Sequence, residues 1–279
     1  MRIAFSDLDG TLLASDKSIS PQTFAALDAM AERGLEFVPC SGRPVVGLPP
    51  ELLAHPSVHY ASCGNGSRIC RIGEDGAPGE VLARTTMSKA SALRLYELTH
   101  ELDIQFDLFA DGKVFSERAR YERLGEFGID PHFLPQVKAM RTPLDETVPE
   151  MLGHVTYLER LTLYWKHEQD CAYIRSLVAE DASLVCVNSL PTNLEISDVA
   201  TTKGASLAWL CEFLGIPREE SVAFGDSSND SSMLEAAGDG VAMANATPEA
   251  IACANHRTAS NDEHGVARYL MALMGELGE

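Results

Sequence analysis

The sequence lacks the features of a membrane-spanning or secreted protein. None of its apolar runs approaches the length of about 20 residues that crosses a bilayer as a helix. The N-terminal stretch, MRIAFSDLDG, is apolar only briefly before Asp7 and Asp9 interrupt it, so it lacks the long apolar region of a signal peptide. We therefore expect a cytoplasmic protein with no membrane partner.

Cysteine is scarce and shows no paired spacing. The seven cysteines are odd in number, and no two form a CxxC pair. This argues against a disulfide framework or a structural zinc site and favours reduced thiols in the cytosol. The residues concerned are Cys40, Cys63, Cys70, Cys171, Cys186, Cys211 and Cys253.

Positive charge is also scarce. The 22 Lys and Arg residues face 41 Asp and Glu residues, which gives a net charge of −19. Such a surface repels nucleic acid and anionic lipid at long range, so we expect neither as a partner. It also repels small phosphorylated molecules. Any phosphate site must then be made locally positive by a metal ion and a few basic side chains.

The first part of the chain alternates strand and helix patterns. Apolar strands are predicted at residues 2–6 and 35–40, and a third near 58–62. Ser20-Pro21 is typical of a helix start, and the apolar residues that follow recur at helical spacing up to Gly34. This order predicts βαβ units and a parallel sheet covered by helices.

The same alternation returns near the C-terminus, with a different pattern between the two parts. Late helices are predicted at 203–214, 229–237 and 248–254, and late strands at 221–225 and 240–243. The middle pairs helix patterns at 88–102 and 168–180 with strand patterns at 104–109, 113–116 and 157–164. We therefore predict an α/β core made of residues 1–82 and 188–279, with an α+β domain inserted at 83–187.

The segment Asp7-Leu8-Asp9-Gly10-Thr11-Leu12 directly follows the first predicted strand. The carboxyl ends of parallel strands form the ligand crevice of such sheets, so both aspartates are predicted there. A helix-capping or turn pair is the ordinary alternative. A calcium loop is another, but the further acidic ligands at EF-hand spacing are missing. By itself this segment does not decide between these alternatives and catalysis.

Three further segments are predicted at the same kind of position. Ser41-Gly42-Arg43 follows the second strand, and Lys203-Gly204 opens a late helix. Gly225-Asp226-Ser227-Ser228-Asn229-Asp230 follows the buried strand at 221–225. A hydroxyl, a cation and a second pair of carboxylates are thus each expected at a strand end or a helix start. Packing alone does not account for four such coincidences.

These four segments, in this order, resemble the motifs of the haloacid dehalogenase superfamily of phosphohydrolases. Their details resemble its Cof-type group, which has a Rossmann-like core and an α/β cap inserted between the second and third motifs. Three further segments match residues typical of that group, namely Asn65-Gly66, Leu194-Glu195-Ile196 and Asn261-Asp262. The sequence departs from the pattern of the group at Ala244, where glycine is usual, and in the stretch before Lys203. The resemblance covers both core segments.

The resemblance implies a role for each acidic residue of the motifs. Asp7 would be the nucleophile that becomes phosphorylated. Asp9 would protonate the leaving oxygen and then activate water. Asp226 would bind Mg²⁺ together with the Asp7 carboxylate and the Asp9 carbonyl oxygen. Asp230 would be a further metal ligand or would orient the water around the metal.

The resemblance also implies a phosphate pocket. Ser41 would donate a hydrogen bond to a phosphoryl oxygen, and Lys203 would neutralise it. Asn229 would hold the phosphoryl group or Lys203, and Arg43 would contact the substrate or brace its loop. The remaining residues assigned to this pocket are Thr11, Gly42, Asn65 and Gly66.

Electrostatics independently requires a metal ion. A carboxylate that approaches a phosphate dianion to about 3.5 Å meets a repulsion of roughly 9 kcal/mol at an effective dielectric constant of about 20. Mg²⁺ between the two groups reverses this sign, and it prefers oxygen ligands.

Three functions fit these observations. The first is a phosphatase that acts on a small phosphorylated metabolite, with sugar phosphates as the leading class. The second is a phosphomutase, which shares these residues but keeps the phosphoryl group on Asp7. The third is a non-catalytic protein that binds phosphorylated metabolites. Such a protein is expected to have lost catalytic residues, and no motif residue is replaced here. The sequence indicates no particular oligomeric state.

Overall fold

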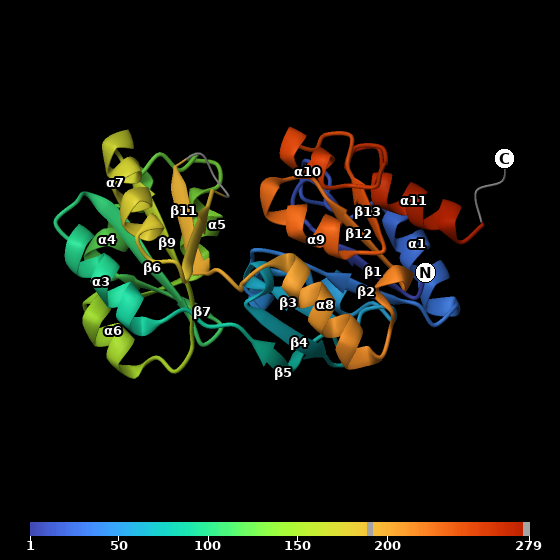
Figure 1. The fold of residues 1–279 in the computed structure, drawn as a ribbon, viewed down its shortest axis with the longest axis horizontal. Coiled ribbons are helices and arrows are strands. Elements are labelled where there is room, and N and C mark those ends of the chain that lie inside the picture. The colour runs from blue at the N-terminus through green and yellow to red at the C-terminus, as the bar shows by residue number, and fades with distance from the viewer. Residues whose placement is uncertain (189–191, 276–279) are drawn as a thin grey trace. The chain divides into compact units, whose positions relative to one another are not determined.

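The chain forms two compact units in the computed structural model, which describes residues 1–188 and 192–275. One unit, the core unit, contains Met1–Arg84 and the chain from Thr202 onward. The other, the inserted unit, contains Thr85–Thr201 (Figure 1). Among the described residues, no helix is long and apolar enough to cross a membrane.

A five-stranded parallel sheet lies at the centre of the core unit. Its strand order is β14-β13-β12-β1-β2, and every neighbouring pair is parallel. The strands are β1 (Ile3–Ser6), β2 (Glu36–Pro39), β12 (Ser221–Gly225), β13 (Asp239–Ala242) and β14 (His256–Arg257). The α/β fold with a parallel core sheet, predicted from the sequence, is confirmed.

Helices cover both faces of this sheet (Figure 1). Side chains alternate between the faces of a strand, so Ala4 and its neighbours Ile3 and Phe5 belong to different apolar clusters. Helices α1 (Pro21–Glu32) and α11 (Gly265–Leu273) pack on the face of Ala4. Helices α8 (Lys203–Leu214) and α9 (Ser231–Ala236) pack on the opposite face. The shorter helices of this unit are α2 (Pro50–Leu53) and α10 (Pro248–Ala252).

Local sequence signals determine where the main helices begin. The Ser20 side chain caps α1 by accepting a hydrogen bond from the amide of Thr23, and Pro21 opens the helix. The Thr202 side chain caps α8 in the same way, through the amide of Ala205. The predicted helix at 203–214 and strand at 221–225 match α8 and β12 residue for residue.

The third predicted strand does not join the parallel sheet. Strand β3 (Tyr60–Cys63) pairs antiparallel with β4 (Arg68–Ile72), which pairs with β5 (Pro78–Arg84). A single bridge between Cys40 and Ser62 connects β3 to the end of β2. The sequence revealed β3 but not this change of partner, because pairing direction depends on contacts between distant residues.

The inserted unit contains a mixed six-stranded sheet in the order β10-β11-β9-β6-β7-β8. All its pairs are antiparallel except β7 with β8. The strands are β6 (Ile104–Ala110), β7 (Lys113–Glu117), β8 (Arg141–Leu144), β9 (Leu158–Trp165), β10 (Leu184–Val187) and β11 (Asn193–Asp198). The helices are α3 (Lys89–Thr99), α4 (Arg118–Glu122), α5 (Leu134–Ala139), α6 (Val148–His154) and α7 (Glu168–Ala179).

The second boundary of the inserted unit differs from the predicted one. The sequence analysis predicted that the chain returns to the core at residue 188, which assigns Leu194-Glu195-Ile196 to the core. In the structure these three residues belong to β11, which pairs with β9 of the inserted sheet. The inserted unit therefore extends to Thr201. The sequence analysis predicted no strand at β11, and pairing with β9 joins residues far apart in the chain.

One face of the inserted sheet buries a charged pair. Phe106 and Leu108 point to the apolar face under the helices, whereas Asp107 points to the other face and is fully buried. Its carboxylate lies 2.7 Å from Nη2 of Arg141, whose side chain is 2% exposed. Ser116 also donates a hydrogen bond to Asp107. Two charges buried this deeply are tolerated only because they are paired.

We predict that Arg141→Met destabilises the inserted unit by about 3–5 kcal/mol, because the Asp107 carboxylate then stays buried without its cation. Urea unfolding should be followed in a Trp209→Phe background, where Trp165 of β9 is the remaining tryptophan. Arg118→Met is the control, because Arg118 pairs with Asp145 at the surface and its loss should leave the unfolding midpoint near that of the parent. Equal midpoints for both variants would contradict the prediction.

Candidate active site

Asp7 directly follows β1, an interior strand of the core sheet, at the carboxyl end of that strand. Strand β1 is buried between β2 and β12, and the Asp7 amide continues its pairing by donating to the carbonyl of Phe224 at 3.0 Å. The predicted position directly after the first strand is thus the observed one. The side chain is itself buried.

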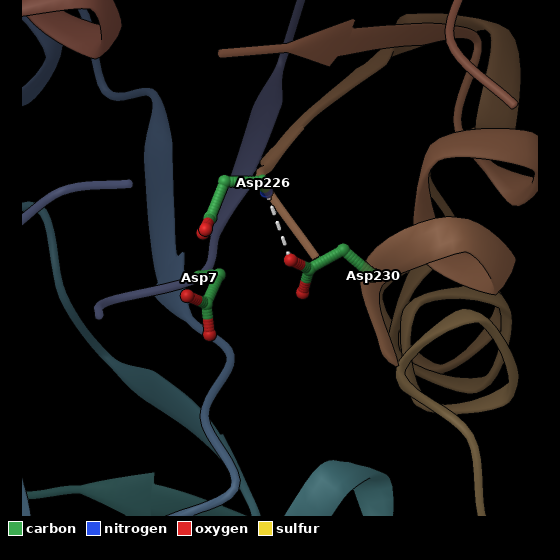
Figure 2. A group of neighbouring side chains, drawn as sticks. All are labelled: Asp7, Asp226 and Asp230. Carbon is green, nitrogen blue, oxygen red and sulfur yellow. Dashed lines mark hydrogen bonds between the residues drawn. The ribbon is translucent and has the colours of Figure 1, made fainter. Parts of the chain in front are cut away.

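Asp226 and Asp230 come from the turn that follows β12. The Asp230 carboxylate accepts hydrogen bonds from the amides of Asp226 at 2.9 Å and Ser227 at 3.0 Å, which closes the turn. Figure 2 shows that this turn places both carboxylates beside Asp7. One oxygen from each of the three residues lies within 4.8 Å of the others.

Lys203 enters this cluster from the first turn of α8. Its side chain is fully buried, and Nζ lies 2.5 Å from Oδ1 of Asp7 and 2.6 Å from Oδ1 of Asp230. The neighbouring Gly204 explains the Lys-Gly motif, because a Cβ atom there would collide with the carbonyl oxygen of Ser232. Glycine lets α8 approach the Asp230 turn closely enough for Lys203 to reach both carboxylates.

The cluster holds three carboxylates against one ammonium group. Burial raises the pKa of Asp7 to about 8, although Lys203 opposes this shift, and burial also raises the pKa of Asp226 to about 6. Burial opposes the charge of Lys203, but Asp230 and Asp7 outweigh it and its pKa is raised. The deficit of positive charge and the all-oxygen donor set fit a divalent cation such as Mg²⁺.

Asp9 occupies a different environment from Asp7. Arg43 donates two hydrogen bonds to the Asp9 carboxylate, from Nε to Oδ2 at 2.8 Å and from Nη2 to Oδ1 at 2.6 Å. Lys17 adds a third contact at 2.9 Å. Burial disfavours the charged form of Asp9, but the contacts with Arg43 and Lys17 prevail and its pKa is lowered. The sequence did not point to Lys17, since no motif spacing links it to Asp9.

Gly10 and Thr11, which directly follow Asp9, both lie next to the Asp226 carboxylate. The Thr11 hydroxyl donates to Oδ1 of Asp226 at 2.7 Å, so it orients this carboxylate, whereas the sequence assigned Thr11 to the phosphate. Gly10 has a φ of +85°, and a Cβ atom there would lie 2.6 Å from Oδ2 of Asp226. Glycine is therefore required by both the backbone conformation and the close approach.

Ser41, Asn65 and Asn229 are joined by hydrogen bonds. The amide of Asn65 donates to the carbonyl of Ser41 at 3.0 Å, and the Asn229 amide group donates to Oδ1 of Asn65 at 3.1 Å. Gly42 lies beside the Asn65 side chain. Gly66 has a φ of +98°, and a Cβ atom there would collide with the carbonyl of Thr202. The structure thus brings Ser41, Gly42, Asn65 and Asn229 of the predicted pocket close to one another, and their role toward phosphate stays a prediction.

Comparison with known proteins agrees with this arrangement. Residues 4–270 match the family of haloacid dehalogenase-like hydrolases. A putative phosphatase of Bacillus subtilis, YxeH, is 29% identical over 96% of this chain and 96% of its own length. Pyridoxal phosphate phosphatase YbhA of Escherichia coli is 28% identical over 96% of this chain and 97% of its own.

Solved structures show the same fold over the whole chain. A haloacid dehalogenase-like hydrolase from B. subtilis has a TM-score of 0.79 at 27% identity and covers 98% of this chain and 100% of its own. A sugar phosphatase of subclass IIB has a TM-score of 0.78 at 20% identity and covers 99% of this chain and 100% of its own. The prediction of a Cof-type phosphatase is confirmed, and the chain belongs to the haloacid dehalogenase-like hydrolase family.

Proposed function

We propose that this phosphatase hydrolyses phosphate monoesters of small metabolites, with sugar phosphates as the leading class, through an aspartyl-phosphate on Asp7. The convergence of Asp7, Asp226, Asp230 and Lys203 at one sheet edge carries the proposal, because it combines a nucleophile, a metal-binding donor set and a cation. The putative phosphatase YxeH and the pyridoxal phosphate phosphatase YbhA support phosphatase activity on a small phosphorylated metabolite.

In the proposed mechanism, a carboxylate oxygen of Asp7 attacks phosphorus and the bond to the ester oxygen breaks. Asp9 gives its proton to the leaving oxygen and is left as a carboxylate. Asp9 then takes a proton from water, whose oxygen attacks phosphorus and breaks its bond to Asp7. Inorganic phosphate leaves, and both side chains return to their starting forms.

The surrounding residues would hold the phosphoryl group. Lys203 already contacts the attacking carboxylate at 2.5 Å, so its charge is in place to offset the negative charge of the phosphoryl oxygens. Ser41 and Asn229 would donate hydrogen bonds to these oxygens, with Asn65 between them. Gly42 would allow backbone amides to approach the phosphoryl group, and Gly66 would serve the same pocket by letting the start of α8, which carries Lys203, approach closely.

Mg²⁺ is the cation that we propose for the oxygen cluster. The carboxylates of Asp7, Asp226 and Asp230 and the carbonyl oxygen of Asp9 would hold it. When bound, it would screen the repulsion between the Asp7 carboxylate and the substrate phosphate.

We assign substrate selection to the inserted unit. This unit has its own sheet and its own apolar core, and it interrupts the core unit between the segments that carry Arg43 and Lys203. We also place the enzyme in the cytoplasm, which the seven free cysteines support.

The substrate class is tested with a panel of sugar phosphates, pyridoxal phosphate and other phosphorylated metabolites in the presence of Mg²⁺. We expect release of free phosphate, with the highest kcat/KM for a sugar phosphate. Isomerisation of a sugar phosphate without free phosphate would instead identify a mutase. Binding of substrate without any turnover would identify a non-catalytic protein.

Chelation by EDTA should abolish phosphate release, and added Mg²⁺ should restore it, because a single ammonium group cannot offset three carboxylates. Asp226→Ala should lower kcat on the order of 1,000-fold or more and should weaken Mg²⁺ binding measured by calorimetry. Asp75→Ala is the control, since Asp75 accepts a hydrogen bond from Ala77 in a surface turn. Full activity in excess chelator would refute the metal-dependent mechanism.

Asp7→Asn should eliminate turnover of every substrate, because an amide cannot form the phosphoenzyme. Asp9→Asn should act unevenly. A sugar hydroxyl needs a proton as its bond breaks, so phosphoryl transfer from a sugar phosphate should slow roughly 100- to 10,000-fold. The phenolate of p-nitrophenyl phosphate leaves as an anion, so its transfer should persist while hydrolysis of the phosphoenzyme slows.

Rapid-quench measurements on Asp9→Asn should therefore show a burst of about one phenolate per site, as expected when an accumulating covalent intermediate precedes a slow step. Mass spectrometry should find the phosphate on the peptide that contains Asp7. Equal losses for both substrates, without trapped phosphate, would show that Asp9 does not have the role assigned to it.

A further inference from the structure

The loop that follows Asp9, residues 10–15, is held by side chains from the far end of the chain. Asn245 donates from Nδ2 to the carbonyl of Gly10 at 2.8 Å, and Asn261 donates from Nδ2 to the carbonyl of Leu13 at 2.9 Å. Asp262 accepts two bonds from Ser15, one from its amide at 2.8 Å and one from its hydroxyl at 2.7 Å. Four hydrogen bonds thus hold one short loop at three points.

The three bracing residues are themselves held in place. The amide of Asn261 donates to Oδ1 of Asn245 at 3.2 Å, so the two asparagines support each other. The next turn is closed by the His264 amide, which donates to the carbonyl of Asn261 at 3.1 Å. Helix α11 begins directly after it, at Gly265. The brace is therefore an ordered part of the core unit.

The braced loop is coupled directly to two residues of the proposed active site. Leu13 forms a bridge with Asp9, and its amide donates to the carbonyl of Leu8 at 2.9 Å. Thr11, inside the loop, orients Asp226. A shift of the Leu13 carbonyl would therefore move the backbone that carries Asp9.

We propose that Asn245, Asn261 and Asp262 are positioning residues that fix the backbone of Asp9 for proton transfer. The inference rests on the acid–base role proposed for Asp9. It also gives a physical role to the Asn261-Asp262 pair, which the catalytic steps do not use. Misplacing a catalytic group by about 1 Å can cost roughly 100-fold in rate.

The exposure of the bracing residues indicates that they position the loop and contribute little to the stability of the fold. Ser15, Asn245 and Asp262 are exposed and Asn261 is half-buried, so water can replace their hydrogen bonds when one partner is removed. The apolar part of the loop is different, because Leu12 and Leu13 are buried in the core. Removing a bracing side chain should therefore loosen the loop while the fold remains intact.

The test measures single-turnover phosphoryl transfer in Asn261→Ala and Asp262→Ala, for a sugar phosphate and for p-nitrophenyl phosphate. We expect transfer from the sugar phosphate to slow roughly 10- to 100-fold, with KM little changed, and transfer from p-nitrophenyl phosphate to slow by less than about 3-fold. Asp262→Asn keeps an acceptor for Ser15 and should recover most of the rate. Asn255→Ala is the matched control, because its amide oxygen accepts a bond from Gly240, away from this loop.

Two measurements show whether the effect passes through Asp9. In an Asp9→Asn background, Asn261→Ala should slow transfer from the sugar phosphate by less than about 3-fold, since residues that act as a unit are not additive. Hydrogen exchange at the Ser15 amide should be faster in Asp262→Ala than in wild type. Equal slowing of both substrates, or full additivity, would overturn the proposal. An inactive wild-type enzyme would instead reject the proposed function, so the two failures are distinguishable.

Discussion

The contact between Lys203 and the carboxylates of Asp7 and Asp230 is the one on which the core unit depends. A fully buried ammonium group is tolerated only where opposite charges surround it. This requirement joins the end of β1, the turn after β12 and the start of α8 at one point. Gly66 and Gly204 are then required as well, because any side chain there would hold α8 away from the cluster. The motifs are thus parts of one electrostatic arrangement.

Asp7 and Asp9 are two residues apart yet have opposite surroundings. Asp7 is buried beside two other carboxylates, and its pKa is raised. Asp9 is partly exposed and held by Arg43 and Lys17, and its pKa is lowered despite partial burial. Such a separation of environments is how one site gives two carboxylates different tasks. The proposed acid step requires Arg43 and Lys17 to release the Asp9 carboxylate when substrate binds, so that the carboxylate can take up a proton.

The departure at Ala244 leaves the backbone near the site unstrained. The described non-glycine residues with a left-handed φ are Lys17, Asn65, Asp111 and His264, so Ala244 has a conformation that a side chain allows. The neighbouring Asn245 still reaches the carbonyl of Gly10. Asn65, in contrast, has a φ of 57° inside the turn that contacts Ser41 and Asn229. Asparagine tolerates this conformation better than most side chains.

Elements whose signals are local could be predicted from the sequence alone. Buried strands β1 and β12 and the capped starts of α1 and α8 could be predicted because a few adjacent residues specify them. The proposed chemistry of the site followed from residue types at strand ends together with the resemblance of their segments to a known family. Features that depend on contacts between distant residues became known only from the folded chain. The partner of β3, the membership of β11 in the inserted sheet, the pairing of Lys17 with Asp9 and the bracing of Leu13 by Asn261 all join residues that no local pattern relates.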